Sequence, residues 1–572
     1  MLRSDRWVVG SDEVALEHRV ALRSAGVAVG PDGGRPVIGI ANSASELNPC
    51  NLPLRELAGA AREGVVEAGG LPVEFPVVSL GEDLMKPTAM LYRNLLAIEI
   101  EEMLRSYPLD GVVLLANCDK TVPGALMGAA STRLPALLVT GGARPPCVFR
   151  GDRIGTGTAL WRLWDERRAG ALDDDAWLEL EHCLSKGTGA CNTMGTASTM
   201  AILAEVLGLL VPGASTIPSG DPRALEAARA TGRRVTELAA HGGSPFAGCD
   251  DASFRNAIRV LSAVGGSTNA VLHLVALAGR LGIGLDLGDF DRLGRDIPLL
   301  VDVEPAGSGL LPDFDAAGGV PALLRELGDL LEPQVVLADG RRTAEVAGTA
   351  PGNAAGAIVP RDRPLATGGA LRVVRGTLAP DGAVLKRSSA TPALLRHRGR
   401  AVVFHSYEEM RHRIDDPSLD VDETSVLVLA GCGPVGGPGM PEWGMIPIPR
   451  KLLEAGVRDM VRVTDARMSG TSFGTVYLHV APEAATGGPL GLVRDGDVID
   501  ADADAGRLDL LVGTDELAAR TAAWRPAVPT TRRGWVSLYR AHVTQAPRGC
   551  DFDFLAPVDD EPPLVEPVVG RS

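Results

Sequence analysis

The chain has 572 residues, of which 45% are hydrophobic and 22% are charged, and its formal net charge is −16. This length exceeds what a single hydrophobic core normally holds, so we expect two or more domains of ordinary globular composition. The negative charge and the lack of a basic stripe argue against nucleic acid as a partner.

The amino-terminal segment MLRSDRWVVGSDEVALEHRV has no apolar core of signal-peptide length. No later segment has the roughly eighteen uninterrupted apolar residues of a membrane span. We therefore expect a cytoplasmic protein with no membrane partner. Its eight cysteines are scattered without a repeating spacing, so metal binding or burial explains them better than a disulfide framework in that reducing compartment.

Apolar strand-like runs alternate with helix-like segments between about residues 36 and 285. The runs are PVIGIA, VEFPVVSL, GVVLLA and PALLVTGG, and a typical helical segment is TAMLYRNLLAIEIEEMLRSY. This alternation predicts parallel βαβ units. TASTMAILAEVLGLLVPG predicts a buried helix that ends at Gly208 or Pro212, and GGSTNAVLHLVALAGRLG predicts another with a Ser267 or Thr268 cap.

The sequence pattern changes after roughly Leu365, where short β-rich runs are separated by glycine, proline and aspartate. Such a pattern is typical of a barrel or sandwich with few helices. We therefore predict an α/β protein in two parts. Residues 1–365 would form an α/β domain whose parallel sheet is flanked by helices, residues 366–572 would form a β-barrel domain, and residues 332–365 would form the linker region.

The stretch GVVLLANCDKTVPG, residues 111–124, predicts a buried strand that runs into a turn. Cys118, Asp119 and Lys120 would lie just beyond the carboxyl end of that strand. Ligands of open α/β sheets bind in the crevice outside the strand ends. The alternative is that Cys118 is an inert buried residue and that its two neighbours are ordinary turn charges.

Three other cysteines stand in similar settings, near a strand end or a glycine-rich turn: Cys50, Cys191 and Cys432. Such settings stabilise the thiolate that metal binding requires. Three thiolates are fewer than the four that usually fill an iron–sulfur cluster, and the open iron position would suit a Lewis acid. The remaining cysteines are predicted to be packing residues: Cys147, Cys183, Cys249 and Cys550.

Carboxylates in loops after apolar runs offer ligands for magnesium or manganese, although each alone is also an ordinary turn acid: Glu82, Asp119 and Glu442. The loop Gly431–Gly436 has the spacing of a dinucleotide-binding loop, but prolines occupy the positions where the required helix should follow. Ser469 lies in a Ser-Gly-Thr turn that lacks the surroundings of a hydrolase nucleophile.

Seven motifs in order resemble one enzyme family: ELNPCN, GEDLMKPTAMLYRNL, NCDKTVPG, ACNTMGTASTM, GGSTNAVLHL, GPGMPEWG and DARMSGTSFGTVYLHVAPEA. The family comprises the dehydratases that include dihydroxy-acid dehydratase, phosphogluconate dehydratase and the aldonic (sugar) acid dehydratases. The resemblance covers nearly the whole chain. It implies an N-terminal α/β domain, a C-terminal β-barrel, and a homodimer or homotetramer with the site between the domains.

The resemblance also implies two metal groups. One is an iron–sulfur cluster, for which the first cysteine favours [2Fe-2S] over a four-iron cluster. Its ligands would be Cys50, Cys118 and Cys191. The other is Mg²⁺ or Mn²⁺, whose ligands would be Glu82, Asp119, Glu442 and a carbamylated Lys120.

The implied reaction is a β-elimination of water. Ser469 matches the family's base in its alkoxide form, assisted by Thr471, and an adjacent metal must lower the pKa of the hydroxyl. Magnesium would hold the carboxylate and 2-hydroxyl while Ser469 removes the C2 proton, and the open iron would take the 3-hydroxyl. The resulting enol would tautomerise to a 2-keto-3-deoxy acid.

GTGTALWRLWDERRAG followed by CNTMGTASTM resembles the sugar-acid branch of the family. We therefore expect a small polyhydroxy acid, such as a pentonate, as substrate. Two alternatives remain. One is dihydroxy-acid dehydratase of valine and isoleucine synthesis. The other is a non-catalytic iron or redox sensor, against which the intact set of Ser469, Lys120 and the three carboxylates argues.

Overall fold

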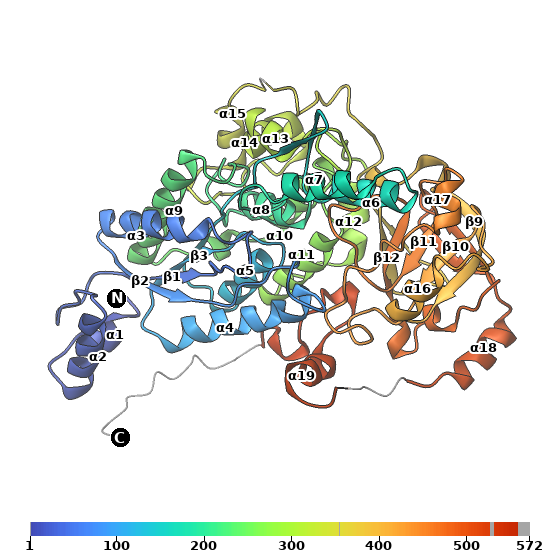
Figure 1. The fold of residues 1–572 in the computed structure, drawn as a ribbon. Helices are drawn as coiled ribbons and strands as arrows, with labels where there is room; N and C mark the ends of the chain where they lie inside the picture. Colours follow the sequence, from blue (N-terminus) through green and yellow to red (C-terminus); the bar gives the residue numbers. More distant parts are fainter. Residues whose placement is uncertain (1, 354, 527–530, 559–572) are drawn as a thin grey trace.

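The computed structural model describes residues 2–353, 355–526 and 531–558. Figure 1 shows two units side by side, an α/β unit built from the first part of the chain and a β-barrel built from the last part. Both halves of the predicted fold class are thereby confirmed.

The N-terminal unit is built on a four-stranded parallel sheet with the strand order β2-β1-β3-β4. Every strand overlaps a predicted apolar run, although β2 begins before the run VEFPVVSL and ends within it: β1 (Val37–Asn42), β2 (Leu71–Pro76), β3 (Gly111–Leu115) and β4 (Ala136–Val139). Parallel strands need crossover connections, and these place helices on both faces of the sheet.

Alternate strand residues face two different helical layers. Ile38 and Val113 pack in one hydrophobic cluster with α3 (Leu54–Glu67) and α9 (Pro222–His241). Val112 and Leu114 pack on the opposite face, in the cluster that contains α4 (Arg93–Ser106) and α5 (Thr121–Thr132). Because both faces are covered, the central strand β3 and its neighbour β4 are apolar along their whole length, whereas the edge strand β2 exposes Glu74.

Three further helices form the interior of this unit: α8 (Thr196–Val206), α10 (Asp251–Ala263) and α11 (Asn269–Arg280). Helix α8 ends just before Gly208, which was one of its two predicted ends. The φ of this residue, +77°, is a conformation that favours glycine. Peripheral helices complete the unit: α1 (Asp5–Val8), α2 (Glu13–Ser24), α12 (Leu287–Gly294), α13 (Leu311–Ala316) and α14 (Gly319–Leu327).

Residues 332–365, expected to form a linker region, instead pack onto the N-terminal unit. They include α15 (Thr343–Gly348), and Leu337, Val346 and Ile358 belong to the main hydrophobic core. Val301 pairs with Ile358 in a short antiparallel bridge. Apolar residues spaced through the segment provide enough buried surface to hold it against the core.

A small insertion lies between β4 and α8. It consists of β5 (Cys147–Phe149), β6 (Asp152–Ile154), α6 (Thr158–Arg168) and α7 (Asp174–Leu184), and it has its own hydrophobic cluster. Cys147 and Cys183 form a disulfide between β5 and α7, so their assignment as packing residues alone was wrong. Sequence spacing carries no information on such a pairing, because the fold brings β5 and α7 together. Cys249 and Cys550 are free and buried, as predicted.

The C-terminal unit is an eight-stranded sheet with the order β14-β13-β9-β10-β11-β12-β8-β7. A bridge between Arg375 and Arg507 joins its two edges and nearly closes the predicted barrel. The strands are β7 (Leu371–Val374), β8 (Gly382–Lys386), β9 (Arg396–Phe404), β10 (Val426–Leu429), β11 (Arg462–Thr464), β12 (Val476–Ala481), β13 (Val498–Asp502) and β14 (Arg507–Leu510). The accompanying helices are α16 (Tyr407–Arg413), α17 (Arg450–Glu454), α18 (Thr514–Ala523) and α19 (Gly534–His542).

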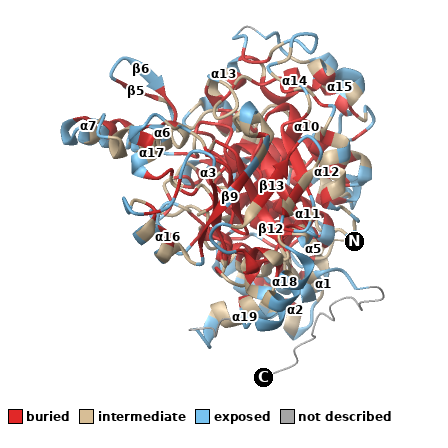
Figure 2. Ribbon diagram, turned by 90° about the vertical axis from the view of Figure 1, so that its right-hand side faces the viewer, coloured by how far each residue is buried: buried red, intermediate tan, exposed pale blue. Residues whose placement is uncertain are grey.

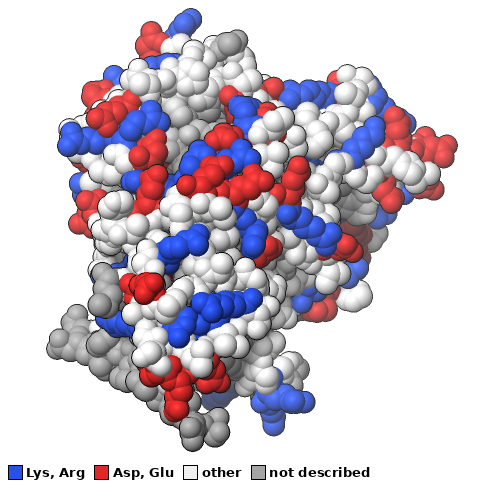
Figure 3. All heavy atoms as spheres, turned by 90° about the vertical axis from the view of Figure 1, so that its left-hand side faces the viewer, with Lys and Arg blue, Asp and Glu red and all other residues white. Residues whose placement is uncertain are grey.

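Figure 2 shows that buried residues fill the barrel strands and α10, whereas α7 is largely exposed and α19 is mostly of intermediate burial. Basic and acidic side chains are interspersed on the face of the N-terminal unit in Figure 3, with no broad patch of one sign. None of the helices in the described part of the chain has both the length and the apolar character that a bilayer crossing requires.

Candidate functional site

Most of the predicted site residues follow the carboxyl ends of strands. In the N-terminal sheet, Cys50 follows β1, Glu82 follows β2, and Cys118 with its two neighbours follows β3. These three strands are adjacent and parallel, so their following loops meet at one edge of the sheet. In the barrel, Glu442 follows β10 and Ser469 follows β11, which are also parallel neighbours.

These loops enclose one cavity of about 870 Å³ between the two units. All the predicted site residues except Lys120 line it: Cys50, Glu82, Cys118, Asp119, Cys191, Glu442, Ser469 and Thr471. Lys120 is completely buried directly behind the wall. The fold therefore brings together residues that lie up to 421 positions apart in the sequence.

Three carboxylates form a compact cluster in the wall of this cavity. One oxygen each of Glu82, Asp119 and Glu442 lies within 4.8 Å of the others, which is a spacing that can hold a metal ion. The Lys120 ammonium forms ion pairs with Asp119 and, at 3.4 Å, with Glu442. The donor set is entirely oxygen apart from this amine, which suits Mg²⁺ or Mn²⁺.

Two residues that the sequence analysis missed hold this cluster. Arg467 donates hydrogen bonds to Glu442 at 2.8 Å and to the Thr88 hydroxyl at 3.0 Å. Thr88 in turn donates to Glu82 at 2.6 Å, so Arg467 connects two carboxylates that come from different units. The Asn269 amide donates to Glu442 at 3.0 Å and lies 3.2 Å from the Met468 carbonyl, next to Ser469.

The pKa values of the two glutamates in the cluster shift in opposite directions. Burial, followed by the proximity of Glu442, raises the pKa of Glu82 to about 7. Burial alone would also raise the pKa of Glu442, but the adjacent Lys120 and Arg467 outweigh it and lower that pKa below its usual value. A cation held among the three oxygens would relieve the mutual repulsion that affects Glu82.

The three predicted cluster thiols face the same cavity. The loops of Cys50 and Cys118 are joined by their neighbours, because Asn117 donates to the Cys50 carbonyl at 2.7 Å and Asn51 accepts from the Cys118 amide at 3.0 Å. A hydrogen bond with the Cys50 thiol and burial raise the pKa of Cys118 well above its usual value. Burial and Cys50 also raise the pKa of Cys191 to about 12. Three convergent soft donors fit an iron–sulfur cluster.

Cys432 does not belong to this group. It is buried against β9 and β10 in the hydrophobic cluster on the barrel, and it does not line the cavity. No helix follows the Gly431–Gly436 loop directly, since the next one is α17, which agrees with our rejection of a dinucleotide site.

The Ser469 turn completes the cavity wall. The Ser469 and Thr471 hydroxyl oxygens are 3.0 Å apart, and the Thr471 amide lies 3.4 Å from Ser469 Oγ. The indole of Trp161 in α6 donates to the Thr471 hydroxyl at 3.0 Å, a contact between the two units that the sequence analysis did not predict. A serine flanked by hydrogen-bond donors beside a metal-binding cluster can act as a general base.

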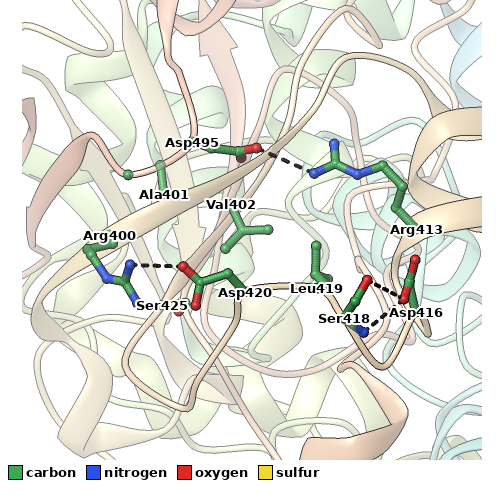
Figure 4. A pocket seen from close by; sticks show the side chains of 11 residues that line it. Arg400, Ala401, Val402, Arg413, Asp416, Ser418, Leu419, Asp420, Ser425 and Asp495 are labelled. Atoms are coloured by element: carbon green, nitrogen blue, oxygen red, sulfur yellow. Dashed lines mark hydrogen bonds and ion pairs between the residues drawn. The ribbon is translucent and has the colours of Figure 1, made fainter.

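A smaller cavity of about 360 Å³ on the outside of the barrel differs in kind (Figure 4). Its charged side chains pair with one another: Arg400 with Asp420 at 3.2 Å, and Arg413 with Asp495 at 3.4 Å. It holds neither thiols nor a carboxylate cluster, so the chemistry of the chain is assigned to the larger cavity.

Comparisons with known proteins identify the family of this chain. The family model described as dihydroxy-acid/6-phosphogluconate dehydratase N-terminal matches residues 35–346, and the corresponding C-terminal model matches residues 356–550. The chain is 48% identical over 563 residues to an L-arabonate dehydratase of Azospirillum brasilense, covering 97% of both chains. It is 46% identical over 568 residues to a 6-deoxy-6-sulfo-D-gluconate dehydratase of Pseudomonas putida, covering 98% of both.

A dihydroxy-acid dehydratase of Ignicoccus hospitalis is 37% identical over 545 residues, covering 94% of this chain and 98% of that protein. The chain therefore belongs to the dihydroxy-acid/6-phosphogluconate dehydratase family, as the seven motifs indicated. It is an enzyme of the hydro-lyase class.

Proposed function

We propose that this enzyme dehydrates an aldonic acid to a 2-keto-3-deoxy acid with the help of an iron–sulfur cluster and Mg²⁺. The observation that carries the proposal is the convergence of three thiols, three carboxylates and the Ser469 turn on one cavity. The sugar-acid substrate is supported by the names of relatives at 48% and 46% identity, compared with 37% for the dihydroxy-acid relative.

Both metal groups have matching donors in this chain. Cys50, Cys118 and Cys191 would hold the [2Fe-2S] cluster, and Glu82, Asp119 and Glu442 would hold Mg²⁺. Carbamylation would convert the Lys120 amine, which already contacts two of these carboxylates, into a further oxygen ligand. When bound, the metals supply Lewis acidity toward the oxygens of the substrate.

The chain's own residues account for the proton transfer. Ser469 Oγ takes the C2 proton, the C–H electron pair forms the C2–C3 double bond, and the C3–O bond breaks. The leaving hydroxyl takes up a proton and departs as water. The enol then moves its hydroxyl proton to C3, which gives the keto acid. Asn269 keeps Ser469 close to the carboxylate cluster, because its amide contacts both Glu442 and Met468.

The test is anaerobic purification followed by iron and sulfide analysis, a visible spectrum, and assays of D- and L-pentonates, hexonates and 2,3-dihydroxyisovalerate. We expect two irons and two sulfides per chain and a preference for an aldonate. A marked preference for dihydroxyisovalerate would identify a dihydroxy-acid dehydratase instead. A protein that stays colourless after reconstitution would contradict the cluster, and one that carries it but converts none of the acids would favour a sensor.

Ser469→Ala separates the base from the cofactors. This variant should retain the visible spectrum and lose about 10²- to 10⁴-fold in turnover, the usual contribution of a general base. Full turnover by the variant would remove Ser469 from the base role, and the retained spectrum controls for folding and cluster loading.

A further inference from the structure

The beginning of α6 is docked on Thr471 by three separate contacts. Trp161 Nε1 donates to the Thr471 hydroxyl at 3.0 Å, and the Thr158 hydroxyl donates to the Thr471 carbonyl at 2.9 Å. Gly157, with a φ of +106°, lies so close that an added Cβ would come within 2.8 Å of the Thr471 side chain. This segment is GTGTALWRLW, the motif that resembled the sugar-acid branch.

The indole of Trp161 fixes the direction of its hydrogen bond to Thr471. An indole N–H can only donate, so Thr471 Oγ1 must accept from Trp161. The hydroxyl hydrogen of Thr471 is then free to be donated, and Ser469 Oγ lies 3.0 Å away. The Thr471 amide approaches the same oxygen at 3.4 Å. Ser469 Oγ therefore accepts from the Thr471 amide and is placed to accept from the Thr471 hydroxyl as well, and such bonds favour the deprotonated form of an acid.

The surroundings restrict the rotation of Thr471. Its side chain is buried, and its methyl group faces Gly195, where an added Cβ would lie 3.1 Å away. On the barrel side, the fully buried Lys386 ammonium lies 3.4 Å from the carbonyl of Gly470 and holds the middle of the turn. With its methyl group and backbone held, the Thr471 hydroxyl is left between Trp161 and Ser469.

We infer that Trp161 is a positioning residue of the dehydration: its indole N–H holds the Thr471 hydroxyl as a hydrogen-bond donor to Ser469 Oγ. The inference rests on the proposed function, since it assigns Ser469 as the base. It connects an insertion of the N-terminal unit to the reacting turn of the barrel. The carboxylate cluster and the thiols are not involved.

The test is Trp161→Phe, which keeps an aromatic ring and removes the N–H. We expect kcat to fall about three- to tenfold, the value of one neutral hydrogen bond, with little change in KM. The acid limb of the pH–rate profile should move to higher pH, because Ser469 would lose a stabilising donor in its basic form. An unchanged kcat and pH profile would overturn the inference.

Trp177→Phe is the matched control. Trp177 lies in α7 of the same insertion, packs against Trp164 at a centroid distance of 5.5 Å, and does not line the cavity. This variant should keep the wild-type pH profile. A shift of the profile in both variants would indicate a general loosening of the insertion and would contradict a specific role for the Trp161 N–H.

A second readout does not depend on activity. With nitrogen-labelled indoles, Trp161→Phe identifies one N–H resonance of the holoenzyme. That resonance should move in Thr471→Val and stay in place in Thr471→Ser, which keeps the acceptor oxygen. A resonance unaffected by Thr471→Val would refute the contact. If the wild type converts no acid while the resonance still responds, the proposed function fails and the contact stands.

Discussion

The carboxylate side and the thiol side of the cavity differ in the charged groups that surround them. On the carboxylate side, Lys120, Arg467 and Asn269 contact the acidic oxygens, and the pKa of Glu442 is lowered although most of its side chain is buried. On the thiol side, burial and the neighbouring Cys50 dominate, and the pKa of Cys191 rises to about 12. Lys120 and Arg467 favour the anionic form of Glu442, whereas the pKa of Glu82 is raised to about 7 and the thiols must lose protons when a soft metal binds.

The same contrast appears within one residue type. Glu205 in α8 is also buried, more deeply than Glu442, but its partners are neutral donors, namely the amides of Gly213 and Ser215 and the Ser215 hydroxyl. Burial raises its pKa to about 7. The sign of the shift thus follows from the presence of a cationic partner and not from burial itself.

The largest expected effect comes from the thiol side. Cys118→Ser should abolish the visible absorption of the cluster and reduce turnover below detection, because a serine hydroxyl is a poor ligand for iron that thiolates hold. The spectrum and the iron content of anaerobically purified protein measure this. Cys432→Ala is the control, because Cys432 is equally buried but lies outside the cavity. Loss of the cluster in the control would show that the wrong cysteines were assigned.

Glu442→Gln tests the carboxylate side. It should weaken Mg²⁺ binding by more than about 100-fold, since even partners of metal ligands contribute about 10- to 100-fold, while the visible spectrum is retained. A titration of Mg²⁺ against turnover, together with the spectrum, measures both. Glu454→Gln, an exposed glutamate in α17, serves as the control. Loss of the spectrum together with Mg²⁺ affinity would mean that the two sides are not independent.

Arg467→Met removes the connection between the two units without removing a ligand. We expect Mg²⁺ affinity to fall about 10- to 100-fold, because Glu442 and Thr88 lose their shared donor. Arg467→Lys should restore little of the Mg²⁺ affinity. A single ammonium cannot reproduce the forked contacts of the guanidinium, which also include the Met440 carbonyl at 2.7 Å. Full recovery in the lysine variant would show that only the positive charge matters.

The smallest effect concerns stability and pH. Folding raises the pKa of Glu205 from 4.5 to about 7, so the folded state retains a proton that the unfolded state releases between these values. Stability from this group is therefore greatest below pH 4.5 and declines as pH rises to 7, by on the order of 3 kcal/mol. Glu205→Gln should flatten this dependence in thermal unfolding, whereas Glu179→Gln, an exposed carboxylate, should not. Parallel profiles for wild type and Glu205→Gln would contradict the assignment.

Much of the fold could be predicted because its strands are short apolar runs with clear boundaries. The four parallel strands and the eight barrel strands each overlap a run recognised in the sequence, with β2 displaced from its run by a few residues. The prediction of a linker over residues 332–365 was wrong, because Val346 and Ile358 are part of the core. The disulfide between Cys147 and Cys183 was missed because it depends on how β5 and α7 pack.

The sequence predicted residues that line the candidate cavity, but it did not predict the side chains that hold them in place. Arg467 and Asn269 lie inside motifs already quoted, DARMSG and GGSTNAV, yet nothing in the sequence indicated that they contact Glu442. Trp161 is 310 residues from Thr471 along the chain, and only the folded structure shows the hydrogen bond between them. The roles of the predicted ligands themselves stay predictions until the variants above are measured.

The insertion of β5, β6, α6 and α7 has its own hydrophobic cluster and its own covalent cross-link, and it supplies one wall of the cavity without contributing a carboxylate to the metal cluster. Apart from the segment that contacts Thr471, the cavity-lining residues of the insertion can therefore change without altering the loops at the strand ends. Such a division allows a family with one elimination chemistry to acquire new substrates by exchanging a single peripheral segment.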